Sequence, residues 1–363
     1  MKSLHKNVFG RIKSWVHLHH TATFALAGTG VVLAAGLVAF VLLFQAPQAT
    51  PATTVVTKKP TPSPPPIYYS PLTGEKVPDE ASTQAAVTGI MIENSPDARP
   101  QSGLKPAGVV FEAIAEGGIT RFLALYQQAK PQLIGPVRSV RLYYVDWVAP
   151  FQASVAHIGG SKFALNEVRN GKYRDIDQFF NAGSYWRATD RYAPHNVYTS
   201  FERLDALNQK KGYTTSVFTA WPRRDGAPAK TPTATSIDVK ISGPLYNSHY
   251  DYDATSNTYK RFEGGAPHND REAGQITPSV VIVMDTTMNL IFEDGYREQI
   301  TTTGSGRARI FQDGTITEAT WTKKDRGSQI SFTSADGKEI PLVRGQTWIT
   351  AVPANQGGGV VWK

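Results

Sequence analysis

The chain opens with a basic segment followed by a long apolar one. Residues 24–44 (FALAGTGVVLAAGLVAFVLLF) form a run of 21 residues without a charge, which spans roughly 30 Å at helical rise. Residues 1–23 carry Lys and Arg but no Asp or Glu, a pattern typical of a cytoplasmic flank. We therefore expect a single transmembrane helix over 24–44, with the rest of the chain outside the cytoplasm. A signal peptide cleaved at Ala46 or Ala49 is the alternative.

The next segment contains too few apolar side chains to form a hydrophobic core. Residues 45–66 hold seven prolines, five threonines and no acidic residue. This composition predicts an extended, polyproline-like stalk. At ~3.1 Å per residue, such a stalk holds the following region up to roughly 65 Å from the bilayer.

Residues 67–213 mix strand and helix patterns and are expected to form an α/β domain. Short apolar or alternating runs bounded by Gly and Pro predict strands, and 3.6-residue spacing predicts helices. Ser200 has the residue type of a helix N-cap. The expected strands are Thr88–Glu93, Val109–Ile114, Thr120–Tyr126 and Ser154–His157, and the expected helices are Leu142–Val148, Lys162–Val168 and Ser200–Gln209.

A shift in composition at Trp221–Thr235 places a linker or long loop at 214–240, and residues 241–363 are expected to form a β-rich domain. Its first two strands, Leu245–Asp253 and Thr258–Phe262, flank a polar tip and predict a hairpin. The fold class is therefore α+β, with a mixed domain followed by a β-rich one. The later strands are expected at Val280–Met284, Ala308–Gln312, Thr315–Trp321, Gln329–Thr333 and Trp348–Val352.

The net charge of +8 is concentrated beside the predicted membrane segment. Residues 1–66 contain six Lys and Arg and no acid, which leaves 32 basic and 30 acidic side chains in residues 67–363. A nucleic-acid binder would carry its positive charge on the folded part, so no nucleic-acid partner is expected. The absence of cysteine from the sequence excludes disulfides, thiolate metal sites and thiol nucleophiles.

Ten motifs follow one another along the chain in a fixed order. They are Pro71–Glu75, Glu93–Leu104, Ala115–Tyr126, Ile134–Arg141, Ala156–Ser161 and Arg191–Ser200, followed by Tyr250–Gly265, Pro267–Asp270, Gly304–Gly314 and Gly345–Val352. This ordered series resembles the YerB-like bacterial lipoproteins, a two-domain family of unknown function. The resemblance implies an extracytoplasmic location and a two-domain architecture, but no reaction. This chain lacks the lipid-accepting cysteine of the lipoproteins and has the apolar run 24–44 in its place.

Charged residues next to glycines in the first domain are the candidates for a functional site. Histidine and carboxylate side chains can act as general acids or bases, and arginines bind carboxylate or phosphate oxygens. Each residue taken alone is more often structural, but their density in short spans favours a ligand site in one cleft. The candidate catalytic residues are Glu116, His157, Asp190 and His195, and the candidate ligand-binding residues are Arg121, Arg138, Arg141, Arg191 and Asn196.

Other kinds of site have weaker support in the sequence. No His pair has the i, i+4 spacing of a helical metal site, and the loop at Asp251–Asn257 lacks the glycine and closing glutamate of a calcium-binding loop. No Gly-x-Ser-x-Gly motif is present. Gly304–Gly306 is interpreted as a short turn before Arg307, without the context of a phosphate loop. We therefore expect no metal and no cofactor.

Two functions remain open at this stage. The first is a membrane-anchored binding or scaffolding module that recognises an anionic cell-wall glycan, a peptide or an envelope protein. The second is an envelope hydrolase or transferase that uses Glu116, His157 and His195. Binding ranks first because no nucleophile–base pair is recognisable, and the sequence does not decide whether the protein is an enzyme.

Overall fold

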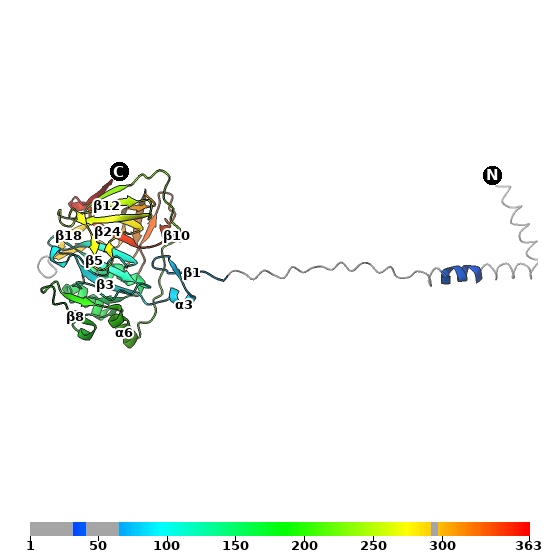
Figure 1. Cartoon of the computed structure of the whole chain (residues 1–363), viewed down its shortest axis with the longest axis horizontal. Helices are drawn as coiled ribbons and strands as arrows, with labels where there is room; N and C mark the ends of the chain where they lie inside the picture. Colours follow the sequence, from blue (N-terminus) through cyan, green and yellow to red (C-terminus); the bar gives the residue numbers. More distant parts are fainter. Residues whose placement is uncertain (1–31, 41–64, 292–296) are drawn as a thin grey trace, which may run out of the picture. The chain divides into compact units, whose positions relative to one another are not determined.

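The computed structural model describes residues 32–40, 65–291 and 297–363. Residues 32–40 are helical and form part of one unit, and residues 65–363 form a second, compact unit (Figure 1). None of the helices formed by the described residues is long and apolar enough to cross a membrane. Most of the predicted transmembrane helix (24–31 and 41–44) and most of the stalk (45–64) lie outside the described residues.

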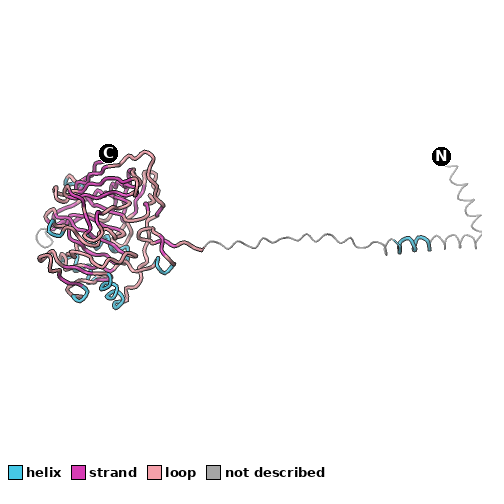
Figure 2. The backbone as a smooth tube through the Cα atoms, in the orientation of Figure 1, coloured by secondary structure: helices cyan, strands magenta, loops and turns pink. Residues whose placement is uncertain are grey.

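The larger unit is built mainly from strands, with a few short helices (Figure 2). Its largest element is a ten-stranded mixed sheet. In spatial order the strands are β22 (Ser331–Thr333), β21 (Thr315–Lys323), β20 (Gly304–Gln312), β17 (Val280–Thr286), β24 (Thr347–Pro353), β4 (Val109–Glu116), β5 (Ile119–Tyr126), β3 (Thr88–Glu93), β6 (Ser154–Ala156) and β7 (Arg174–Asp175).

A second sheet of five antiparallel strands comes from the C-terminal half. Its order is β14 (Ala266–Pro267), β13 (Thr258–Glu263), β12 (Ser248–Asp253), β11 (Ser236–Lys240) and β25 (Gly359–Trp362). Small strand pairs complete the unit: β1 (Tyr68–Tyr69) with β2 (Lys76–Val77), β8 (Tyr185–Arg187) with β9 (Val197–Thr199), β10 (Arg223–Arg224) with β23 (Leu342–Val343), β15 (Asn269–Asp270) with β16 (Gly274–Gln275), and β18 (Met288–Ile291) with β19 (Arg297–Ile300).

Among the described residues, the α-helices of this unit are α3 (Glu80–Thr83), α4 (Leu142–Val148), α5 (Lys162–Asn170) and α6 (Phe201–Lys211). The predicted bounds of α4 and β3 are confirmed residue for residue. Ser200 is the N-cap of α6, as predicted, and its side chain accepts a hydrogen bond from the Arg203 amide. The predicted α+β fold is confirmed in its coarser form, as a fold with mixed sheets and few helices.

The interpretation of Gly304–Gly306 as a turn was wrong. These residues are the first three of β20, paired with Trp321–Lys323 of β21. A side chain at Gly306 would meet the Trp321 ring at 2.6 Å, so close packing between the two strands, and not a change of chain direction, explains this glycine.

The ten-stranded sheet joins the two halves of the sequence. Strand β24, near the C-terminus, pairs in parallel with β4, and Thr350 lies beside Glu112 in the register. Helix α4 covers one face of this region, where Trp147 stacks on Phe111 with ring centroids 5.5 Å apart. On the opposite face, Phe122 contacts His268, which follows the short strand β14. The two halves therefore share one core. The assignment of residues 214–240 as a linker or long loop remains a prediction.

A buried ionic network holds the five-stranded sheet against the ten-stranded one. Arg261 of β13 is fully buried, and its Nη2 lies 3.1 Å from both carboxylate oxygens of Glu112 on β4. Glu112 also accepts a hydrogen bond from Trp348 Nε1, and Arg261 contacts Glu263 at 3.3 Å. Buried charges persist only with such partners, so this network ties the N-terminal half to the C-terminal half.

Candidate functional site

A tight hairpin turn brings the first two candidate residues together. Strand β4 ends at Glu116, β5 begins at Ile119, and the two residues between them are Gly117 and Gly118 with φ of 56° and 80°. Positive φ at both positions is what a two-residue hairpin turn requires, and glycine adopts it without strain. A register shift between Ile114 and Glu116 marks an irregularity at the end of β4. Arg121 follows on β5, close to Glu116.

Three arginines surround the Glu116 carboxylate. Arg121 Nη2 donates a hydrogen bond to Glu116 Oε2 at 3.0 Å, Arg141 Nη2 contacts Oε1, and Arg297 Nε lies 3.8 Å from Oε1. Backbone carbonyls hold two of these guanidinium groups in place: Arg121 donates to Ser139 O, and Arg141 donates to Val140 O. Burial lowers the pKa of Arg121 from its ordinary value. Three guanidinium groups therefore converge on the Glu116 carboxylate, and the carboxyl group of Glu298 also interacts electrostatically with Arg141 and Arg297.

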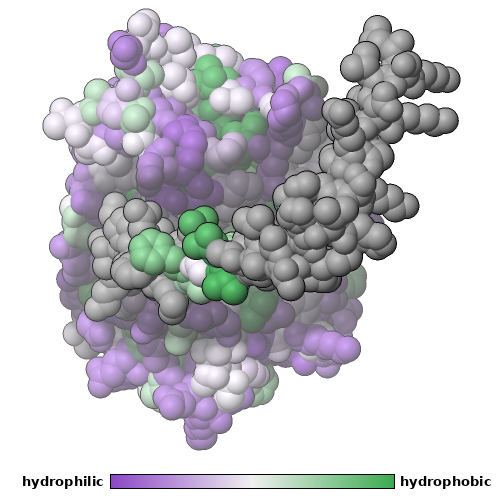
Figure 3. Space-filling view, turned by 90° about the vertical axis from the view of Figure 1, so that its right-hand side faces the viewer, coloured by the Kyte–Doolittle hydropathy of each residue, from purple (hydrophilic) through white to green (hydrophobic). Residues whose placement is uncertain are grey.

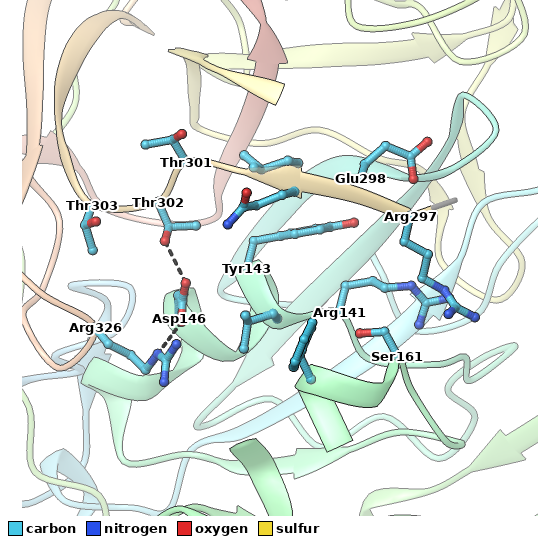
Figure 4. A pocket seen from close by; sticks show the side chains of 14 residues that line it. Arg141, Tyr143, Asp146, Ser161, Arg297, Glu298, Thr301, Thr302, Thr303 and Arg326 are labelled. Carbon is cyan, nitrogen blue, oxygen red and sulfur yellow. Dashed lines mark hydrogen bonds and ion pairs between the residues drawn. The ribbon is translucent and has the colours of Figure 1, made fainter. Parts of the chain in front are cut away.

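The arginine cluster borders a cleft of about 540 Å³ between α4, α5 and β19. Figure 4 shows Arg141, Arg297 and Ser161 at one end of this cleft, Tyr143 in its middle, and Asp146 with Arg326 at its other end. Its volume is in the range of ligand sites. The lining residues are Arg141–Tyr143, Asp146, Ser161, Phe163, Arg297–Thr303 and Arg326.

The far end of the cleft is closed by an ion pair. Asp146 accepts hydrogen bonds from Thr302 Oγ1 at 2.7 Å and from Arg326 Nε at 2.5 Å. Arg326 also contacts Glu167 of α5 at 2.7 Å. These bonds connect α4, α5 and the segment after β19, so they fix the walls of the cleft relative to one another.

The candidate catalytic residues do not meet. His157 is buried, with Nδ1 2.8 Å from Gly159 O and Nε2 2.9 Å from Asp175. Asp190 is paired with Arg271 at 2.7 Å. His195 Nδ1 lies 3.0 Å from Glu93 Oε1. Within the described residues no hydrogen bond or ion pair joins any two of these three residues and Glu116. The groups around Glu116 and His195 adjoin, because Glu93 lies opposite Arg121 in the register of β3 and β5.

The remaining candidate arginines contact oxygen atoms of the protein. Arg138 Nε lies 3.3 Å from Glu93 Oε1, the atom that His195 also contacts. Arg191 donates hydrogen bonds to the carbonyls of Asp97 and Pro100. Asn196 accepts a hydrogen bond from Arg187 and donates to two carbonyls of its own loop. Of the candidates, the structure gathers Glu116, Arg121 and Arg141, and among these only Arg141 lines the 540 Å³ cleft.

Sequence reasoning missed one wall of the cleft. Arg297 and Glu298 belong to β19, a strand of four residues that was not predicted. Burial alternates along this strand: Arg297 is half-buried, Glu298 buried, Gln299 exposed and Ile300 buried, as expected for a strand. Four residues are too few to distinguish a strand from a loop by sequence. No group of three or more His, Asp or Glu suited to a metal ion occurs in residues 32–40, 65–291 and 297–363.

The fold and the site define a two-domain protein with mixed sheets, few helices and an arginine-bordered cleft. The chain belongs to the DUF3048 family of proteins of unknown function: residues 72–214 match its N-terminal domain and residues 237–349 its C-terminal domain.

Two comparisons with a Bacillus subtilis protein agree with this assignment. The chain is 33% identical over 289 residues to the putative lipoprotein YerB of that organism, a match that covers 78% of this chain and 86% of that protein. The crystal structure of YerB superposes with a TM-score of 0.73 at 30% identity, covering 81% of this chain and 99% of that one. The resemblance to YerB-like lipoproteins is therefore confirmed.

Proposed function

We propose that this protein is a membrane-tethered, extracytoplasmic module that binds an anionic ligand of the bacterial cell envelope in the cleft between α4, α5 and β19. The observation that carries the proposal is the convergence of three arginines on Glu116 at the edge of that cleft. Guanidinium groups bind anions through charge-assisted hydrogen bonds.

The relative and the N-terminal sequence both support the proposed location. The Bacillus subtilis relative is named a putative lipoprotein, and such proteins are held at the membrane by a lipidated cysteine. This chain has no cysteine, so the apolar run 24–44 and the proline-rich residues 45–66 supply the tether and the spacer in this proposal. Most of the coloured surface in Figure 3 is hydrophilic, which suits a domain exposed to water.

Binding is favoured over catalysis by the arrangement of the candidate catalytic residues. Glu116 is held by arginines, His157 is buried against Asp175, and His195 contacts Glu93. A hydrolase or transferase needs its base within hydrogen-bond reach of its nucleophile or of the attacked group. These three side chains do not provide such a pair, so the cleft is assigned a binding role.

Sedimentation with purified peptidoglycan tests the proposal. The full chain in detergent micelles should sediment with insoluble peptidoglycan, and Arg297→Gln should weaken this retention about tenfold or more, because one charge-assisted hydrogen bond contributes roughly 1.5–3 kcal/mol. Arg307→Gln is the matched control, since Arg307 lies on β20 with a side chain 61% exposed and does not line the cleft. Equal retention of Arg297→Gln and the unaltered protein would contradict an anion site at this cleft.

A further inference from the structure

We propose that the turn at residues 178–181 docks on the surface of an anionic lipid bilayer, with the side chains of Phe179 and Phe180 inserted among the lipids. The inference rests on the membrane tether of the proposed function and goes beyond its anion site, since the described lining of the cleft does not include this turn. It gives the larger unit a defined face toward the membrane.

The turn displays two adjacent phenylalanines to solvent. Phe179 is 66% exposed and Phe180 is 70% exposed. They lie between β7 and the short 3-10 helix Ala182–Ser184. Single exposed apolar residues are normal on protein surfaces, whereas large apolar side chains gathered at one place mark a surface that contacts a partner or a membrane.

The buried carboxylate of Asp177 fixes the conformation of the turn. Its Oδ1 accepts hydrogen bonds from the backbone amides of Phe179 and Gly159, each at 3.2 Å. Its Oδ2 accepts a hydrogen bond from Arg169 at 2.7 Å, and its backbone carbonyl accepts one from the Phe180 amide at 3.2 Å. The Asp177 side chain is 0% exposed, and a buried charge persists only with such partners. The display of the two rings is therefore built into the fold.

The charge exposed around the turn is positive. Residues 169–187 contain four basic and two acidic residues. The acidic side chains, those of Asp175 and Asp177, are 17% and 0% exposed and contact His157 and Arg169. The acids of this segment are therefore largely covered and paired, which leaves a surface that suits an anionic partner. The basic residues are Arg169, Lys172, Arg174 and Arg187.

Two guanidinium groups lie directly beside the turn. That of Arg169 lies 4.9 Å from the centroid of the Phe180 ring. That of Arg203, on α6, donates a hydrogen bond to the Gly183 carbonyl at 3.4 Å and lies 4.7 Å from the centroid of the Trp186 ring. Binding to a membrane surface strengthens with the apolar area inserted and with each cation beside an anionic headgroup. Guanidinium groups also match the phosphate oxygens of lipids, so this turn supplies both contributions.

The tether makes a weak surface contact sufficient. Two partly inserted side chains bind an untethered protein only weakly and reversibly to a membrane. In the proposed function, residues 45–66 form a spacer of at most roughly 65 Å, which keeps the larger unit at a high effective concentration beside the bilayer. The bilayer is therefore the partner that is always within reach of the turn.

Quenching of a fluorescent label by lipids tests the inference. The chain has no cysteine, so an Ala182→Cys variant can be labelled with bimane at one exposed position next to the turn. Ala254→Cys, at the exposed tip of the hairpin formed by β12 and β13, is the matched control. The full chain is reconstituted into vesicles of equal parts phosphatidylcholine and phosphatidylglycerol. Spin labels on the acyl chains should quench the bimane of Ala182→Cys several-fold more strongly than that of Ala254→Cys.

The composition of the bilayer and the side chains of the turn should both change this result. In vesicles of phosphatidylcholine alone, the ratio of docked to undocked chains should fall by roughly fivefold for each arginine at the surface. Phe179→Ser combined with Phe180→Ser should make the two labels equal, because no apolar side chain is left to insert. Leu245→Ser removes another exposed apolar side chain, 56% exposed and outside the turn, and should leave the quenching unchanged. A melting curve for each variant establishes that it is folded.

The outcomes separate the docking from the proposed function. A chain that floats with the vesicles but shows equal quenching of both labels would overturn the docking and leave the tether in place. Excimer emission between pyrene labels on Ala182→Cys chains, without quenching by lipids, would assign the turn to a contact between two copies and would also overturn it. A chain that does not float with the vesicles would remove the tether and the docking together. Peptidoglycan retention is measured in micelles and through Arg297, so it tests the anion site independently.

Discussion

Replacing Glu112 with alanine should destabilise the larger unit by about 3–5 kcal/mol, the cost of leaving a buried charge without its partner. Arg261 is fully buried and contacts both oxygens of Glu112. In the variant, the 3.3 Å contact with Glu263 is the one ion pair that its guanidinium group keeps among the described residues. Because Glu112 and Arg261 lie in different halves of the chain, both halves should lose stability in one transition. Denaturant unfolding followed by tryptophan fluorescence measures the effect.

Two further variants control this result. Glu318→Ala removes a carboxylate that is 54% exposed, and such surface charges contribute little. The double replacement Glu112→Met with Arg261→Met removes both charges of the pair and should recover part of the lost stability, because no buried guanidinium group is left without Glu112. Glu263 loses Arg261 in this variant but keeps its ion pair with Arg99 at 3.6 Å. If Glu112→Ala costs no more than Glu318→Ala, the network does not hold the two sheets together.

Acid should destabilise the same network through His268. This side chain is buried, its Nδ1 accepts a hydrogen bond from Arg261 Nε at 2.8 Å, and its Nε2 lies 3.0 Å from Gln101 Oε1. Burial, followed by the positive charges of Arg261 and Arg99, lowers the pKa of His268 well below its ordinary value. Below a pH of about 6.5 the unfolded chain binds a proton that the folded protein excludes, so the free energy of unfolding falls by about 1.4 kcal/mol per pH unit.

A variant isolates this contribution from the other titrating groups. His268→Asn places an amide oxygen near the position of Nδ1 and has no group that titrates between pH 5 and 7. Burial raises the pKa of Glu263, which opposes the effect of His268, but Glu263 is present in both proteins. The stability of the unaltered protein relative to the variant should therefore decrease as the pH falls from 7 to 5. Parallel curves of unfolding free energy against pH would show that His268 does not titrate on unfolding.

Local patterns in the sequence were sufficient for much of the secondary structure. The apolar runs at β3 and β17 and the helical spacing at α4 are complete within a few residues, so no distant contact is needed to recognise them. The pairing of β24 with β4 brings together residues more than 230 positions apart, such as Thr350 and Glu112. No short-range sequence pattern indicates which distant strands pair, and the shared sheet was therefore not predicted.

The candidate site was predicted only in part, because local sequence shows which residues are close along the chain but not which distant segments meet. Glu116 and Arg121 are joined by a short glycine turn, which fixes their proximity from sequence. Similar glycines and charged residues flank His157, Asp190 and His195. The positions of these three residues depend on where their loops pack in the fold, which the local sequence does not determine. Arg297 and Arg326 enter the cleft from segments more than 150 residues away from Arg141, and only the tertiary fold brings these three residues together.

Hydrogen exchange with and without soluble peptidoglycan fragments is the most direct test of the claim that the cleft is the binding site. The full chain in detergent micelles should show slower exchange in peptides covering residues 160–165 and 297–303 when the fragments are added, because a bound ligand restricts opening of the segments that it contacts. Peptides of the shallow hollow lined by Trp186, Asp190 and Arg271 should be unchanged. Protection confined to that hollow, with no change at 160–165 and 297–303, would contradict the account.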